Sequence, residues 1–216
     1  SDVCSSDLLH FTNQVELHSE SVHNGDWCKC PDFCYTLSPL AELSGKTIGI
    51  IGFGSIGKRV AQIAESFDMQ ILIHSCSHKD LSGFKNARQV KKDELFSVSD
   101  FITCHCPLTS ETENMINADS LSKMKSSAVL INTSRGPVVD ENALANALNT
   151  GKIAGAALDV LKKEPADSEN PLLNAKNCII TPHIAWAAKE TRARLLSILD
   201  RNIECYLAGK PQNKVN

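Results

Sequence analysis

The chain has 216 residues, of which 42% are hydrophobic and 22% are charged, and its formal net charge is −3. This length suits one domain of ordinary size, or one domain and a fragment of another. The small charge gives no electrostatic reason to expect nucleic acid or an anionic membrane as partner. No apolar run is long enough to span a bilayer, and no basic-then-apolar leader is recognisable.

The sequence contains nine cysteines, an odd number scattered along the chain. Several stand inside apolar runs, which favours reduced thiols of a cytoplasmic protein over a disulfide framework. Cys28, Cys30 and Cys34 lie close together, with His23 nearby. Their spacing is not that of a zinc finger or ribbon, which needs a close pair of cysteines and a distant second pair, so no metal site is expected.

The residues before Lys46 show the weakest apolar periodicity in the sequence. Residues 1–8 show no clear period and resemble translated adaptor sequence, so we expect an artefact that takes no part in the fold. Residues 9–26 have the apolar spacing of the second half of a helix, with a glycine near its end. Residues 27–45 contain prolines and a glycine and are typical of a connector.

From Lys46 onward, short apolar strands alternate with amphipathic helices. Strands are expected over residues 46–51, 69–74, 101–104, 128–131, 154–158 and 178–180. Helices are expected over residues 56–67, 140–149 and 190–207. The apolar face of the first of these helices is expected to contain Ile56, Val60, Ile63, Ala64 and Phe67. Buried strands that alternate with helices predict an α/β fold, a Rossmann-type doubly wound parallel sheet.

A glycine-rich turn of sequence GFGSIG joins the first of these strands to the first helix. In a dinucleotide-binding turn Gly52 would permit the sharp bend, Gly54 would let the backbone approach a pyrophosphate, and Gly57 would let the helix pack on the strand. The amides of Ser55 and Ile56 would point at the phosphates. The alternative is a glycine turn without a ligand. The place of the turn between a strand and a helix favours a cofactor site.

The second strand is followed by Ser75. NAD-binding domains of this type carry an Asp or Glu there, which binds the ribose 2′-hydroxyl. Without a carboxylate nothing repels a 2′-phosphate, and His78 or Lys79 could attract one. The cofactor is therefore expected to be NAD or NADP, and the residues leave both open.

Three further segments place polar residues just beyond predicted strands, where an open α/β sheet binds its ligands. The first contains Arg135, which can grip a carboxylate through two parallel hydrogen bonds. The second contains Asp159 and Glu164, and the third contains His183, a candidate proton donor because histidine titrates near neutral pH. An arginine alone could form a surface ion pair, and a histidine alone is more often structural. Their combination on one sheet favours a catalytic site.

Five motifs occur in order between Lys46 and about Ala187: GIIGFGSIGK, CHCPLTSETENMI, LINTSRGPVVDE, AGAALDVLKKEP and TPHIAWA. The stretch that contains them, roughly two-thirds of the chain, resembles the D-isomer-specific 2-hydroxyacid dehydrogenase family. It is most similar to the glycerate dehydrogenase and hydroxypyruvate reductase branch, and Trp186 contributes to that similarity.

The resemblance implies that Arg135, Glu164 and His183 carry the catalysis. Arg135 would bind the substrate carboxylate and polarise the 2-keto oxygen. His183 would donate a proton to that oxygen as hydride arrives, or act as base in the reverse direction. Glu164 would hydrogen-bond His183 and favour its protonated form.

The resemblance also implies a set of residues along the cofactor. Asp159 would lie near the nicotinamide carboxamide. The remaining cofactor-lining residues would be Cys106, Pro107, Thr133, Ser134 and the backbone from His183 to Trp186. The acid that this family usually carries after the second strand is replaced by Ser75, which weakens the assignment of NAD and not the family.

Members of this family have two lobes, and the residues before Gly52 are too few to build most of the substrate lobe. The resemblance implies an N-terminally truncated member with a remnant of that second lobe. Residues 9–45 would form an interdomain and dimer-contact helix with its connector, residues 46–186 the dinucleotide-binding domain, and residues 187–216 a C-terminal helix that returns toward the substrate lobe. A full-length form is expected to be a homodimer.

The expected reaction is hydride transfer between NAD(P)H and a small 2-keto or 2-hydroxy acid, with hydroxypyruvate or glyoxylate reduced to D-glycerate or glycolate. This chain alone is expected to bind cofactor but to turn over poorly, because hydride transfer needs near-attack geometry and exclusion of water. Two alternatives stay open: a dinucleotide-sensing protein like the transcriptional corepressors related to this family, and a related dehydrogenase for phosphoglycerate or lactate.

Overall fold

The computed structural model describes residues 2–214, and the chain divides into two compact units, Ser1–Pro182 and His183–Asn216. The first unit contains a seven-stranded sheet. The second contains the helix α8 (Lys189–Leu207). No helix within the described residues is both long and apolar enough to cross a bilayer.

The sheet of the first unit has the strand order β3-β2-β1-β4-β5-β6-β7, and every neighbouring pair is parallel. The strands are β1 (Thr47–Ile51), β2 (Gln70–His74), β3 (Ala87–Gln89), β4 (Phe101–Cys104), β5 (Val129–Asn132), β6 (Gly155–Leu158) and β7 (Cys178–Ile180). The predicted α/β fold with a doubly wound parallel sheet is confirmed. The strand order reverses direction between β1 and β4, the place where such sheets bind ligands.

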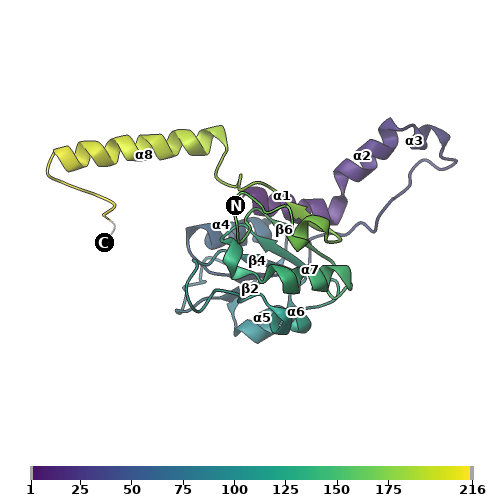
Figure 1. Cartoon of the computed structure of the whole chain (residues 1–216), viewed down its shortest axis with the longest axis horizontal. Coiled ribbons are helices and arrows are strands. Elements are labelled where there is room, and N and C mark those ends of the chain that lie inside the picture. The colour runs from purple at the N-terminus through teal and green to yellow at the C-terminus, as the bar shows by residue number, and fades with distance from the viewer. Residues whose placement is uncertain (1, 215–216) are drawn as a thin grey trace. The chain divides into compact units, whose positions relative to one another are not determined.

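Three helices precede the first strand: α1 (Asp2–Asn13), α2 (Val15–His23) and α3 (Asp26–Lys29). The helices between the strands cover both faces of the sheet. They are α4 (Ser55–Ser66), α5 (Lys92–Val98), α6 (Ala118–Lys123) and α7 (Glu141–Asn149), with short 3-10 helices η1 (Gly136–Val138) and η2 (Pro171–Asn174). In Figure 1, α4 lies on one side of the labelled strands β2 and β4, and α5 and α6 lie on the other.

Two apolar cores lie on the opposite faces of the sheet, because successive side chains of a strand point to opposite sides. In β2, Ile71 and Ile73 belong to the core that also contains Val60 of α4. Leu72, which stands between them, belongs to the other core with Phe96 of α5. Both cores bury strand side chains almost completely, so the sheet is a rigid platform for the loops at its edges.

The structure corrects the expectation that residues 1–8 take no part in the fold. The described residues 2–8 form the first part of α1, and Cys4 and Leu8 are buried in the same core as Val60. Cys4 and Leu8 stand one helical turn apart, which brings both to one face of the helix. Ser1 lies outside the described residues, and the origin of the segment stays a prediction.

The expected role of residues 9–45 as an interdomain and dimer-contact segment stays a prediction. Within the described chain, α1 lies in the same unit as the sheet. The reason is close packing, since a Cβ atom on Gly155 of β6 would stand 2.4 Å from the ring of Phe11. The second unit begins at His183, whereas the sequence placed the start of the final segment at residue 187.

Candidate active site

The carboxyl ends of β1, β2 and β4 are level, which brings their loops to one place. Ile51 is in register with His74 on one side and with Cys104 on the other. The backbone continues this pairing beyond the strands: the amide of Gly52 donates to the carbonyl of His74 at 2.9 Å, and the amide of His105 donates to that of Ile51 at 2.7 Å. The glycine turn therefore lies at the reversal of strand order.

Two of the three glycines in the turn are required by the protein itself. Gly52 has φ 93°, and a Cβ there would stand 2.6 Å from the backbone of His105. A Cβ on Gly57 would stand 2.1 Å from the carbonyl oxygen of Gly52. With no side chain at Gly52, the turn packs directly on the backbone of the loop after β4. With none at Gly57, α4 packs directly on the turn.

Gly54 is different, because no described atom other than those of its chain neighbours lies within 4 Å of the Cβ that it lacks. Its backbone is extended, with φ −85° and ψ −161°, so its conformation does not demand glycine. Gly54 is also the N-cap of α4, and no side chain caps the helix. The free amides at a helix start favour an anion. Open space above a bare backbone at this point fits the phosphates of a dinucleotide.

The loop after β5 is organised by Asn132, whose side chain is fully buried. Its Oδ1 accepts hydrogen bonds from the amide and the hydroxyl of Ser134, at 3.0 and 2.8 Å. Its Nδ2 donates to the carbonyl of Arg135 at 2.9 Å, and Arg135 Nη1 donates to the Ser134 carbonyl at 2.7 Å. This network fixes the backbone from Thr133 to Arg135 at the strand end.

The loops that carry Arg135 and Glu164 are in direct contact. A Cβ on Gly136, the residue after Arg135, would stand 2.0 Å from the carbonyl group of Leu161. The amide of Leu161 in turn donates to Glu164 Oε1 at 3.0 Å. The structure therefore brings together the segments of two of the three predicted catalytic residues.

Asp159 follows β6 directly and its side chain is buried, with 2% of its surface exposed. Its amide donates to the carbonyl of Asn132 at 3.0 Å. Its carboxylate accepts a hydrogen bond from the hydroxyl of Thr181 at 2.5 Å. Thr181 follows β7, so this bond links the ends of β6 and β7. Thr181 was not among the residues predicted for the site, although its place directly after a strand was a usable signal.

The loop after β4 contains His105, Cys106 and Pro107. His105 Nε2 lies 2.9 Å from the hydroxyl of Thr103, and burial lowers the pKa of His105 to about 4. Burial raises the pKa of the Cys106 thiol, which is therefore neutral at physiological pH. His105 was also not selected from the sequence. It presents a neutral, partly buried ring beside the glycine turn.

His183 and Trp186 belong to the second unit. His183 has φ 54°, in the left-handed region, and the amide of Ala187 donates to the carbonyl of Ile184 at 2.9 Å in the turn that follows. The hydrogen bond between Glu164 and His183 that the resemblance implies stays a prediction.

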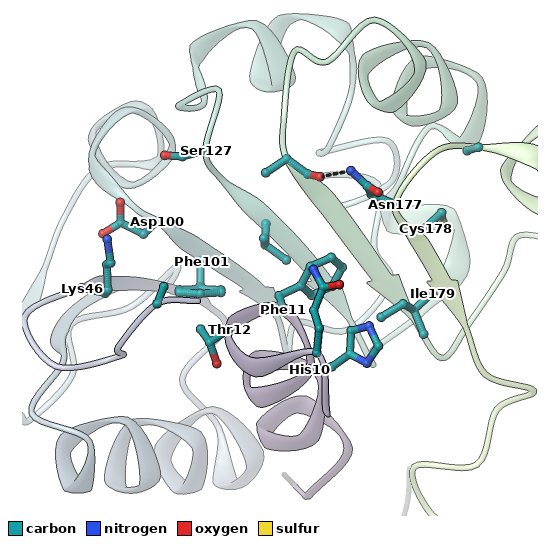
Figure 2. Close-up of a pocket in the computed structure, with 15 residues that line it drawn as sticks. His10, Phe11, Thr12, Lys46, Asp100, Phe101, Ser127, Asn177, Cys178 and Ile179 are labelled. Atoms are coloured by element: carbon teal, nitrogen blue, oxygen red, sulfur yellow. Dashed lines mark hydrogen bonds between the residues drawn. The ribbon is translucent and has the colours of Figure 1, made fainter. Parts of the chain in front are cut away.

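A cavity of about 440 Å³ lies at the opposite end of the strands from the glycine turn. Figure 2 shows it with Lys46, Asp100 and Asn177, which immediately precede β1, β4 and β7. The side chain of Asn177 closes one side by donating to the carbonyl of Ala154 at 3.0 Å. Because the strands are parallel, this cavity is at their amino ends and is separate from the glycine turn.

Comparison with known proteins adds an independent observation. Residues 6–185 match the family described as "D-isomer specific 2-hydroxyacid dehydrogenase, NAD binding domain". The chain is 47% identical over 97% of its length to a hydroxypyruvate reductase of Blautia hydrogenotrophica. It is 45% identical over 92% of its length to a glycerate dehydrogenase of Methylorubrum extorquens. It spans 65% and 62% of the lengths of these relatives.

Among solved structures, the chain is similar to an acyclic imino acid reductase in complex with NADPH and D-Arg. The TM-score is 0.84 at 36% sequence identity, and the match covers 97% of this chain and 64% of that one.

Proposed function

Because the chain belongs to the D-isomer-specific 2-hydroxyacid dehydrogenase family, whose NAD-binding domain it matches, we propose that it is the cofactor-binding part of an oxidoreductase. The reaction is hydride transfer between NAD(P)H and a small 2-keto or 2-hydroxy acid. The names of the two relatives favour hydroxypyruvate as substrate, with D-glycerate as product, and a further relative named glyoxylate reductase favours glyoxylate, with glycolate as product. The observation that carries this proposal is the contact between the loops of Arg135 and Glu164. Both loops lie at the carboxyl ends of the strands, as the glycine turn does.

The cofactor is NAD or NADP, and when bound it supplies or accepts the hydride. Its phosphates are held by the backbone at Gly54 and by the first amides of α4, those of Ser55 and Ile56. Ser75 would stand at the ribose, and the remainder of the site would be lined by Cys106, Pro107, Thr133, Ser134, Asp159 and Trp186. Asp159 is kept in place by its bond to Thr181.

The side chains of this chain then perform three tasks on the substrate. The Arg135 guanidinium binds the substrate carboxylate in a bidentate manner and stabilises negative charge on the keto oxygen. The imidazole of His183 donates a proton to that oxygen and takes it back in the reverse direction. Glu164 hydrogen-bonds the imidazole and stabilises its charged form.

We further propose that a form of the protein as long as its relatives is a homodimer in the cytoplasm. The segment around α2 and α3 exposes large apolar side chains, among them Trp27, Phe33 and Leu40, with 53%, 88% and 53% of their surfaces exposed. Exposed apolar patches of this kind mark interaction surfaces. All nine cysteines are free thiols, which suits a reducing compartment.

The test uses a longer form of the protein, one that spans the full length of its relatives. Oxidation of NADH and of NADPH is measured with hydroxypyruvate, glyoxylate and pyruvate. We expect turnover with hydroxypyruvate or glyoxylate, and we expect His183→Gln to abolish it while cofactor binding persists. Cofactor binding without turnover of any of these acids would favour a dinucleotide-sensing role instead. Unchanged turnover in the His183 variant would exclude it as the proton donor.

A further inference from the structure

The loop between β6 and η2 carries Glu164 and is held on both sides of that residue by one carboxylate, that of Glu141. Glu141 Oε1 accepts a hydrogen bond from the amide of Lys162 at 2.7 Å. Glu141 Oε2 accepts a second from Asn170 Nδ2 at 3.0 Å. These two hydrogen bonds, the Glu141 anchor, fix the start and the end of the segment that contains Glu164.

Asn170 is a well-ordered partner in the anchor because its side chain is buried, with 6% of its surface exposed. Its Oδ1 caps the short helix η2 by accepting the amide of Leu172 at 3.0 Å. That bond sets the orientation of the side-chain amide, so Nδ2 is the group that faces Glu141. A donor in this place needs an acceptor opposite, which the carboxylate supplies.

Glu141 itself stands on the segment that follows Arg135. It is the first residue of α7, whose N-cap Asp140 accepts the amide of Ala143 at 3.1 Å. The amide of Asp140 donates to the carbonyl of Ile116 at 2.8 Å, which ties the start of the helix to the neighbouring backbone. The position of Glu141 is therefore set by bonds outside the loop that it holds.

The segments of Arg135 and Glu164 also meet at a second point, beside the anchor. The missing side chain of Gly136 leaves room for the carbonyl group of Leu161, which a Cβ would approach to 2.0 Å. The amide of Leu161 donates to Glu164 Oε1 at 3.0 Å, and the next amide along the chain is the one that Glu141 accepts. Two successive amides thus bind two carboxylates, which fixes the turn that presents Glu164 against the start of α7.

We propose that Glu141 is a positioning residue of the active site, whose anchor on Lys162 and Asn170 holds Glu164 in place relative to Arg135. The inference rests on the proposed function, which assigns Glu164 to orienting the proton donor. Glu141 acts through the loop and takes no part in the chemical step. A displacement of about 1 Å in such a group is enough to lower a rate by about 100-fold.

The anchor is tested first on the 216-residue chain, by limited proteolysis with trypsin. Trypsin cleaves after lysine, and Lys162 and Lys163 are exposed within the anchored segment. Glu141→Ala should raise the rate of cleavage after these two residues by at least about tenfold, because the loop opens more often without its anchor. Mass spectrometry of the fragments measures the rate. An unchanged rate would overturn the anchor and leave the proposed function untouched.

A paired substitution separates the hydrogen bonds from the size of the side chain. Glu141→Gln keeps an acceptor for the amide of Lys162 but turns a donor toward Asn170 Nδ2, so cleavage should become faster. Combining it with Asn170→Asp exchanges donor and acceptor, and an aspartate at position 170 still accepts the amide of Leu172. This double variant should return cleavage to within about twofold of the parent rate. Cleavage as fast as in Glu141→Gln alone would contradict the anchor.

The positioning role is tested in a form of the protein that spans the full length of its relatives. Glu141→Ala should lower kcat for reduction of the keto acid by about tenfold to 100-fold, while the dissociation constant of the dinucleotide changes by less than about twofold. In a Glu164→Gln background the same substitution should cause no further loss, because two residues that act as one unit are not additive. A merely structural role would add the same loss in both backgrounds.

Asp167→Asn is the matched control, because it removes one negative charge from the same loop. Asp167 forms an exposed ion pair with Lys163 at 2.8 Å, inside the loop. An asparagine there still accepts the amide of Glu169, and exposed ion pairs contribute little. Both the cleavage rate and kcat should stay within about threefold of the parent values.

The outcomes separate this role from the proposed function. A parent of full length that reduces none of the keto acids would overturn the proposed function and the positioning role with it. Turnover that Glu141→Ala leaves unchanged, or an equal loss in the Glu164→Gln background, would overturn the positioning role alone. If Glu141→Ala fails to fold by circular dichroism, Glu141→Gln with and without Asn170→Asp decides the question by the same two measurements.

Discussion

A Cβ atom on Gly57 would stand 2.1 Å from the carbonyl oxygen of Gly52, closer than any side chain can approach a backbone. The start of α4 is thus packed directly on the turn that precedes it. We predict that Gly57→Ala separates the two and lowers the free energy of unfolding by about 2 kcal/mol, the usual cost of overpacking. Urea denaturation followed by circular dichroism measures this change. A variant as stable as the parent chain would contradict this prediction, because it would show that the turn can move to accommodate the methyl group at little energetic cost.

Gly54 should behave in the opposite way, because only its own chain neighbours, among the residues that the structure describes, come within 4 Å of its missing Cβ. We predict that Gly54→Ala leaves the free energy of unfolding within about 0.5 kcal/mol of the parent value. The same substitution should weaken dinucleotide binding by more than about tenfold, because the methyl group occupies the path of the phosphates.

Calorimetric titration with NADH and NADPH measures the binding, and the urea midpoint is the control for folding. If Gly54→Ala bound both dinucleotides normally, the glycine turn would not be the phosphate site.

The sheet could be predicted because its strands are apolar runs bounded by turns, as in residues 101–104, which form β4 as expected. The edge strand β3 was missed, since Ala87–Gln89 has three residues and a mixed polar character. The apolar face of α4 was predicted in part. Val60 and Ala64 are buried in the core and Phe67 packs against it, but Ile63 belongs to neither core and the buried Ala61 was not predicted. Ile56 is 54% exposed, in the first turn of the helix beside the candidate phosphate site.

The candidate site was predictable where a residue stands directly after a strand, as Gly52 and Asp159 do. The groups that fix the loops after the strands were not predictable. Thr181 bonds the carboxylate of Asp159 from 22 positions away in sequence, and Gln89 bonds the carbonyl of Ser75 from 14 positions away. A single sequence does not say which distant side chain will meet which backbone group, so such partners emerge only with the fold.

Arg135 offers a test of the catalytic assignment. Arg135→Lys keeps a positive charge but cannot form two parallel hydrogen bonds with a carboxylate. In a form of the protein as long as its relatives, we expect kcat/KM for the keto acid to fall by about 100-fold to 1,000-fold. The affinity for the dinucleotide should be unchanged, because Asn132 still holds the backbone of the loop.

Steady-state kinetics and cofactor titration of the same preparation separate these effects. Equal losses in cofactor affinity and in turnover would instead point to a collapsed loop and would contradict the assigned role.

His105 should make the stability of the chain depend on pH. Burial lowers its pKa from 6.5 to about 4, so between these values the unfolded chain binds a proton that the folded chain does not. The stabilisation is therefore fully present above about pH 6.5 and is lost as the pH falls toward 4, to a total of roughly 2 to 3 kcal/mol. Urea midpoints measured from pH 7.5 to 4.5 should show this decline. His105→Gln keeps a polar side chain beside Thr103 and cannot titrate, so its midpoints should decline less over the same interval. Parallel curves for the two proteins would mean that His105 accepts its proton in the folded state as readily as in the unfolded one.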